Sequence, residues 1–132
     1  MTRPPQECSI LIVEDETLLA MDVEMMVSDA GYRVLGPVTS IVDAMQIAST
    51  SVIDAAILDI NLQGQPVFPL ADVFASSGIP FVVLSGHQRE MLPERYRDRP
   101  YIQKPYRVEE LLAALKELFA EKPQKDGLAK SA

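Results

Sequence analysis

The chain has 132 residues and a mass of 14.6 kDa, which suits one domain. Its 48% hydrophobic and 23% charged residues are typical of a globular protein, and no apolar run reaches the roughly 18 residues that a membrane span needs. The net charge of −7 argues against general nucleic-acid binding, while the single Cys8 and the lack of a signal peptide predict a reducing, cytoplasmic location without a disulfide.

The first third of the chain predicts a strand, a helix and a second strand. Residues 1–8 form a lead-in, and the continuous apolar run at 9–13 indicates a strand covered on both faces. Apolar residues then recur at helical spacing from Leu19 to Ala30. Residues 33–38 predict a weaker strand.

The same alternation continues through the middle of the chain. Ser40 is a candidate N-cap for the next helix, and residues 55–58 predict a third strand. Pro66 and Pro69 favour the start of a helix. Residues 81–84 predict a fourth strand.

The last third predicts one more strand and helix. Residues 88–97 are rich in arginine and poorly periodic, so the fourth helix of the pattern is expected to have almost no regular structure there. Residues 101–102 predict a short fifth strand. A helical stripe from Val108 to Phe119 closes a domain at 9–120, and residues 121–132 predict a flexible tail. Strands that alternate with helices predict an α/β fold with a mostly parallel sheet and helices on both faces.

Polar side chains follow four of the five predicted strands. Ligands of open parallel sheets bind beyond the carboxyl ends of the strands. Taken alone, each of these residues fits an ordinary role as a helix cap, a turn residue or a solvated loop residue. A polar residue at the end of each of four strands, however, indicates a functional site. The residues concerned are Glu14, Asp15 and Glu16, then Asp59 and Asn61, then Ser85 and His87, and finally Lys104.

These residue types fit phosphoryl transfer. Crowded carboxylates need a cation, and their hard oxygens favour Mg²⁺ or Mn²⁺ over zinc. A carboxylate can accept a phosphoryl group covalently, and a lysine and a hydroxyl can hold the oxygens of that group.

Four ordered motifs resemble the receiver domain of two-component response regulators, over residues 9–119. The motifs are Ile-Val-Glu-Asp-Glu at 12–16, Leu-Asp-Ile-Asn-Leu at 58–62, Leu-Ser-Gly at 84–86 and Lys-Pro at 104–105. The resemblance implies a flavodoxin-like five-stranded parallel sheet with strand order 2-1-3-4-5. It also implies that Asp59 is the phosphoacceptor, and that Glu14, Asp15, Asp59 and the backbone carbonyl of Asn61 bind Mg²⁺.

The resemblance assigns further roles near the same site. Ser85 and Lys104 match the residues that bind the phosphoryl oxygens, and the Lys104–Pro105 peptide bond is expected to be cis. Tyr101 matches an aromatic switch position, although a tyrosine on an outer strand also fits simple packing. His87 fits a loop residue better than a phosphohistidine donor.

Two segments depart from the usual family pattern. Residues 63–67 replace the usual Pro-Gly-x-Asp-Gly loop. The Val-Leu-Ser-Gly at 83–86 approximates the Phe-Ala-Thr-Gly motif of an alphaproteobacterial subgroup, whose single-domain members often work with kinases of the HWE type.

The sequence therefore predicts a stand-alone receiver that takes phosphate from a histidine kinase or a histidine phosphotransfer protein. It catalyses its own phosphorylation and dephosphorylation, without membrane or direct nucleic-acid contact. Its output is either protein contact or drainage of phosphate from a shared kinase. Residues 89–107 hold six basic and three acidic residues, against two and eleven in 1–88. This basic segment is a candidate surface for a downstream partner or a homodimer, and a set of solvated arginines explains it equally well.

Two other functions remain open at this stage. One is an interaction module that kept the fold but does not depend on phosphorylation. The other is a small phosphatase of the haloacid-dehalogenase class, which needs a second aspartate where this chain has Asn61.

Overall fold

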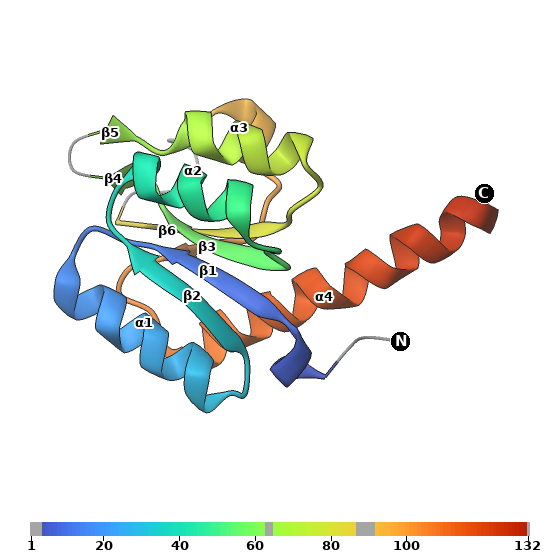
Figure 1. Cartoon of the computed structure of the whole chain (residues 1–132), viewed down its shortest axis with the longest axis horizontal. Coiled ribbons are helices and arrows are strands. Elements are labelled where there is room, and N and C mark those ends of the chain that lie inside the picture. Colours follow the sequence, from blue (N-terminus) through green and yellow to red (C-terminus); the bar gives the residue numbers. More distant parts are fainter. Residues whose placement is uncertain (1–3, 63–64, 87–91, 132) are drawn as a thin grey trace.

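A computed structural model describes residues 4–62, 65–86 and 92–131, and over 61–62, 65–66 and 121–131 it describes the backbone alone. A five-stranded parallel sheet has the order β2-β1-β3-β6-β7, which confirms the predicted α/β fold and its 2-1-3-4-5 order (Figure 1). None of the helices in these ranges is long and apolar enough to span a membrane.

The sheet strands are β1 (Ser9–Val13), β2 (Arg33–Val38), β3 (Ala55–Asp59), β6 (Phe81–Ser85) and β7 (Tyr101–Gln103). The helices are α1 (Thr17–Asp29), α2 (Ile41–Thr50), α3 (Phe68–Ser76) and α4 (Val108–Ser131), with short 3₁₀ turns η1 (Pro5–Glu7) and η3 (Glu94–Tyr96). Ser40 caps α2 as predicted, since its hydroxyl accepts the backbone N–H of Asp43 at 3.2 Å.

The two faces of the sheet are covered by different helices. Successive side chains of a strand point to opposite faces. Ile10 and Ile12 therefore join the core under α1 and α4, while Leu11 and Val13 join the core under α2, α3 and η3. Figure 1 shows α2 and α3 on one side of the sheet and α1 on the other. Every residue of the three central strands β1, β3 and β6 is buried, so their ends are held rigidly.

Two elements differ from the sequence prediction. The short antiparallel strands β4 (Asn61–Leu62) and β5 (Gln65–Pro66) were not predicted. The last helix, α4, continues through Ser131, beyond the predicted helical stripe at 108–119 (Figure 1). The flexibility of residues 121–132 remains a prediction.

Candidate functional site

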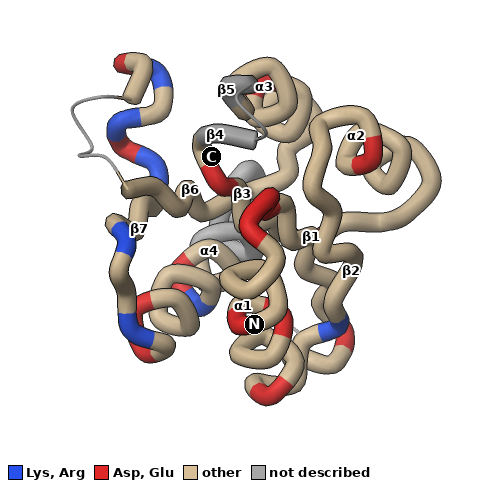
Figure 2. Tube along the Cα trace, turned by 90° about the vertical axis from the view of Figure 1, so that its left-hand side faces the viewer, with Lys and Arg blue, Asp and Glu red and all other residues tan. Residues whose placement is uncertain are grey.

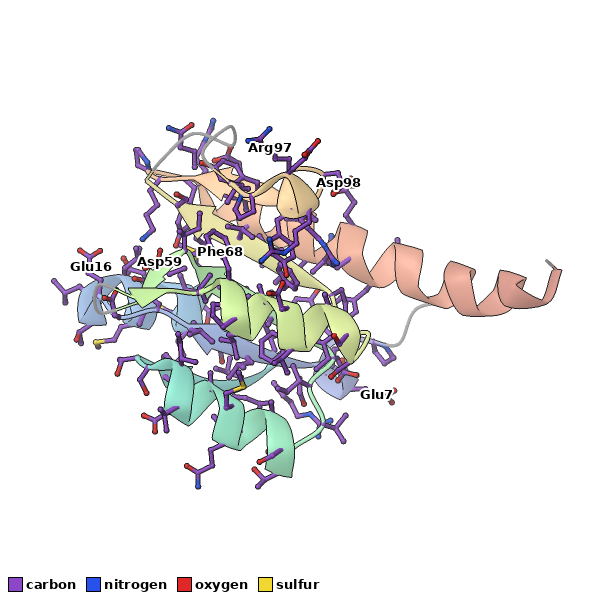
Figure 3. The ribbon with its side chains drawn as sticks, turned by 90° about the horizontal axis from the view of Figure 1, so that it is seen from above. Glu7, Glu16, Asp59, Phe68, Arg97 and Asp98 are labelled. Atoms are coloured by element: carbon purple, nitrogen blue, oxygen red, sulfur yellow. The ribbon has the colours of Figure 1, made fainter. Side chains whose placement is uncertain are left out.

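The predicted site residues lie at one edge of the sheet. Glu14 follows β1, Asp59 ends β3 and Ser85 ends β6. Asp59 pairs in register with Leu84, so Ser85 comes one residue later on the neighbouring strand. Figure 3 shows Asp59 and Glu16 at the same end of the molecule, opposite Glu7.

Three carboxylates meet at this edge. Glu14, Asp15 and Asp59 each offer an oxygen, and these oxygens lie within 4.8 Å of one another. Glu14 is 1% exposed and Asp59 is 7% exposed. The backbone N–H of Glu16 donates to Glu14 Oε2 at 3.1 Å, which holds the turn that leads into α1. The sequence therefore concentrates like charges where little water can screen them.

Lys104, the residue directly after β7, faces this cluster. Its Nζ lies 3.4 Å from Asp59 Oδ1 and 3.4 Å from Glu14 Oε1. Its backbone N–H donates to the carbonyl oxygen of Ser85 at 2.7 Å, and the Lys104–Pro105 bond is cis as the resemblance implies. One ammonium therefore faces three carboxylates, and the cluster formed by these four residues keeps a negative balance.

The electrostatics favour a cation. Burial raises the pKa of Glu14 to about 7, and the charge of Asp59 raises it as well. Burial also raises the pKa of Asp59, against the lowering effect of Lys104. Glu14 Oε1 is buried and accepts no hydrogen bond from the described residues. A set of hard oxygen donors with an unsatisfied oxygen fits Mg²⁺.

Other predicted site residues occupy less decisive positions. Ser85 is 1% exposed at the end of β6. Tyr101 lies half-buried on β7 and packs against the core under α2 and α3. Asn61 begins β4, where the backbone alone is described. His87 lies outside the described residues. The structure brings Glu14, Asp15, Asp59 and Lys104 together. The roles assigned to these four residues and to the others remain predictions.

Within the basic segment, Arg95, Arg97 and Arg99 make contacts inside the molecule. Figure 2 shows Lys and Arg gathered on the β7 side of the sheet. Arg95 donates from Nε and Nη2 to the two carboxylate oxygens of Asp72 on α3, at 3.0 and 3.1 Å. The Tyr96 hydroxyl also hydrogen-bonds to Asp72. Arg99 lies over the Phe81 ring at 4.7 Å. Sequence reasoning missed Asp72, because nothing local marks it as the partner of a residue 23 positions later.

Tyr106 is a further residue that sequence reasoning missed. Its ring packs against the core under α1 and α4, and its buried hydroxyl makes no hydrogen bond to the described residues. Burial raises the pKa of Tyr106 to about 12, and the charges of Glu14, Asp22 and Asp59 contribute to the rise. The only signal in the sequence is that Tyr106 follows the Lys-Pro motif.

Comparison with known proteins identifies the family of the chain. Residues 10–116 match the family model of the response regulator receiver domain. The transcriptional regulatory protein PdtaR of Mycobacterium tuberculosis is 32% identical over 110 residues, which cover 80% of this chain and 54% of PdtaR. The phyllosphere-induced regulator PhyR of Methylorubrum extorquens is 31% identical over 110 residues, covering 80% of this chain and 41% of PhyR. The chain thus spans about half the length of the curated relatives it matches.

Solved structures agree with this match. The solution structure of SdrG from Sphingomonas melonis Fr1 has a TM-score of 0.76 and 38% sequence identity, and the match covers 84% of this chain and 95% of SdrG. A second SdrG structure, from Pseudomonas melonis Fr1, shows the BeF₃-activated conformation and has a TM-score of 0.74. These findings confirm the resemblance on which the sequence prediction rested.

Proposed function

The chain belongs to the response regulator receiver family, and from that premise we propose that Asp59 accepts a phosphoryl group while Mg²⁺ is bound at the same edge of the sheet. The observation that supports this proposal most is the cluster itself. Three carboxylate oxygens lie within 4.8 Å of one another, and the Lys104 ammonium lies 3.4 Å from two of the carboxylates. Glu14, Asp15, Asp59 and the Asn61 carbonyl are the proposed ligands.

The proposed donor is a phosphohistidine on a histidine kinase or a histidine phosphotransfer protein. A carboxylate oxygen of Asp59 attacks the phosphorus, the phosphorus–nitrogen bond breaks, and its electron pair stays on the imidazole nitrogen. Lys104 Nζ donates to one phosphoryl oxygen and the Ser85 hydroxyl donates to another. Bound Mg²⁺ supplies neutralisation of the phosphoryl charge. Buried positions of Glu14, Asp59 and Ser85 keep these groups oriented before the donor arrives.

The proposed output is a phosphorylation-dependent contact with another protein, or drainage of phosphate from a shared kinase. Tyr101 is the proposed aromatic switch, and the region 89–107 is the proposed contact surface. The activated conformation solved for SdrG supports a structural response to phosphorylation in this family. The proposed place of action is the cytoplasm, where the thiol of the buried Cys8, the one cysteine of the sequence, stays reduced.

The test is labelling with acetyl phosphate in the presence of Mg²⁺. We expect an acid-stable, base-labile adduct on Asp59 that is absent from Asp59→Asn. Asp54→Asn is the matched control, because Asp54 is a buried carboxylate just before β3 whose Oδ2 accepts the Ser9 N–H at 2.8 Å. An asparagine oxygen can accept that bond, so this variant should be labelled normally.

Two results would contradict the proposal. One is an equal adduct in Asp59→Asn. The other is no adduct in the folded wild-type protein together with no Mg²⁺-dependent change in stability, which would favour the module that does not depend on phosphorylation. Phosphotransfer profiling against the histidine kinases of the same cell then identifies the donor.

A further inference from the structure

Residues 93–99, which we call the strap, are attached to the neighbouring helix and sheet by their side chains. Within the described part of the chain, the backbone hydrogen bonds of this segment all link its own residues. The chain rejoins the sheet directly after the strap, where the Val83 N–H donates to the Pro100 carbonyl oxygen at 3.0 Å. Pro93 and Pro100 lie at its two ends, and proline has no N–H to donate. The strap can therefore move away from its surroundings as one unit.

The strap closes over two aromatic rings that belong to different elements. Tyr96 is 3% exposed, and its ring stacks on Phe68 of α3 with 6.0 Å between the ring centroids. The same ring meets Phe81 of β6 edge-on at 5.7 Å, and Arg99 lies over Phe81 at 4.7 Å. Aromatic side chains are frequent anchors at protein interfaces. Opening of the strap would thus uncover a surface suited to a partner protein.

Asp72 on α3 holds the strap through two of its residues. Its two carboxylate oxygens accept hydrogen bonds from Nε and Nη2 of Arg95 at 3.0 and 3.1 Å. It also accepts a hydrogen bond from the hydroxyl of the buried Tyr96. The side chains of Arg95 and Asp72 are 56% and 50% exposed, so water competes for both partners and the pair contributes only modestly. Such a contact can open and close readily.

We propose that the strap is an autoinhibitory lid over Phe68 and Phe81, and that Asp72 is the catch that sets how often the lid opens. The inference deepens the proposed function, because the strap is the middle of the region 89–107 that is the proposed contact surface. In the closed form Tyr96 covers the two rings. In the open form the three aromatic rings are available to an apolar side chain of a partner protein.

The experiment is limited digestion with trypsin, without phosphodonor or partner. The bond between Arg97 and Asp98 is a trypsin site in the strap, and both residues are exposed (Figure 3). Their neighbour Tyr96 is buried, so a protease can bind an extended chain here only when the strap is open. The cleavage rate then follows the population of the open form. We expect Asp72→Ala to speed this cleavage about fivefold.

Cleavage after Arg33 is the internal reference, because Arg33 lies in β2 and its peptide bond becomes available only when the sheet unfolds. Its rate should be the same in Asp72→Ala and in wild type. Asp29→Ala is the matched control, since it removes an exposed carboxylate from α1 on the other face of the sheet. This variant should be cleaved after Arg97 at the wild-type rate.

Two further measurements test the catch and the lid separately. Arg95→Gln should also speed cleavage after Arg97, but in the Asp72→Ala background the same change should add less than about 1.5-fold, because the two residues share one interaction. The dye anilinonaphthalene sulfonate binds exposed apolar surface. At low dye concentration its fluorescence should rise in Asp72→Ala by about the same factor as the cleavage.

Four results would overturn the proposal. They are cleavage after Arg97 in Asp72→Ala within twofold of wild type, an equal rise in cleavage after Arg33, independent effects of Arg95→Gln and Asp72→Ala, and unchanged dye fluorescence. Any of these with normal labelling of Asp59 leaves the proposed phosphoacceptor intact. Loss of labelling with the fivefold effect present would instead contradict the proposed phosphoacceptor alone.

Discussion

The described residues around Asp72 and those around Glu14 and Asp59 both combine a basic side chain with carboxylates, and the geometry of the two clusters differs. Arg95 meets both oxygens of Asp72 at 3.0 and 3.1 Å, and the two side chains are 56% and 50% exposed. Lys104 lies 3.4 Å from both Glu14 and Asp59, whose side chains are 1% and 9% exposed. The first pair is matched and solvated, and the second is buried with too few positive charges.

The pKa values of the carboxyls follow this difference. Hydrogen bonds from Arg95 lower the pKa of Asp72, whereas burial raises the pKa of Glu14 to about 7. In a matched pair each side chain stabilises the charged form of the other, so the pair has no unbalanced charge with which to bind a ligand. The buried carboxylates have too few positive partners, so they remain able to bind a cation and to accept a phosphoryl group. Unsatisfied charge distinguishes the candidate site from the structural ion pair.

The largest expected effect is the pH dependence of stability without metal. The pKa of Glu14 is raised in the folded state, so its contribution is fully present below pH 4.5 and is lost as the pH rises through about 7. At about 1.4 kcal/mol per pKa unit, the loss is about 3 kcal/mol in the free energy of unfolding. We expect urea unfolding in EDTA to show this decline between pH 5 and pH 8, and Glu14→Gln to flatten it.

The control for that measurement is Glu109→Gln, which changes an exposed carboxylate on α4 and should keep the wild-type slope. Equal slopes in wild type and Glu14→Gln would contradict the comparison, because Glu14 would then titrate like a solvated side chain.

The next largest effect separates metal binding from phosphoryl transfer. Lys104 is the cation that competes with Mg²⁺ for Glu14 and Asp59. Lys104→Met should therefore tighten Mg²⁺ binding by roughly 1 kcal/mol, or about fivefold, while it slows labelling of Asp59. Lys116→Met, an exposed change on α4, should alter neither quantity. Weaker Mg²⁺ binding in Lys104→Met would show that the lysine supports the metal site instead of competing with it.

Much of the fold could be predicted because local patterns specify it. The apolar runs of β1, β3 and β6 are continuous, since both faces of these strands are covered. The closeness of Glu14, Asp15, Asp59 and Lys104 could be predicted for a related reason, because parallel strands bring their carboxyl ends to one edge.

The remaining features depend on tertiary packing that no local pattern reports. The Asp72–Arg95 pair forms because η3 packs beside α3, 23 residues away in sequence. The burial of the Tyr106 hydroxyl depends on how the chain turns between β7 and α4. The hairpin β4–β5 also went unpredicted, because each strand is only two residues long.

The smallest expected effect lies in the exposed pair itself. Arg95→Gln should lower the melting temperature slightly at pH 7, and the difference from wild type should shrink in 1 M NaCl, where the Debye length falls to about 3 Å. Because the pKa of Asp72 is lowered in the folded state, the contribution of the pair is present above pH 3.8 and is lost as the pH falls through the lowered value. The pH trend of this variant is therefore opposite to that of Glu14. The contrary result is that Arg95→Gln destabilises the protein as much as the titration of Glu14 does, independently of salt. The exposed ion pair would then be a main source of stability, and unsatisfied charge would no longer distinguish the two clusters.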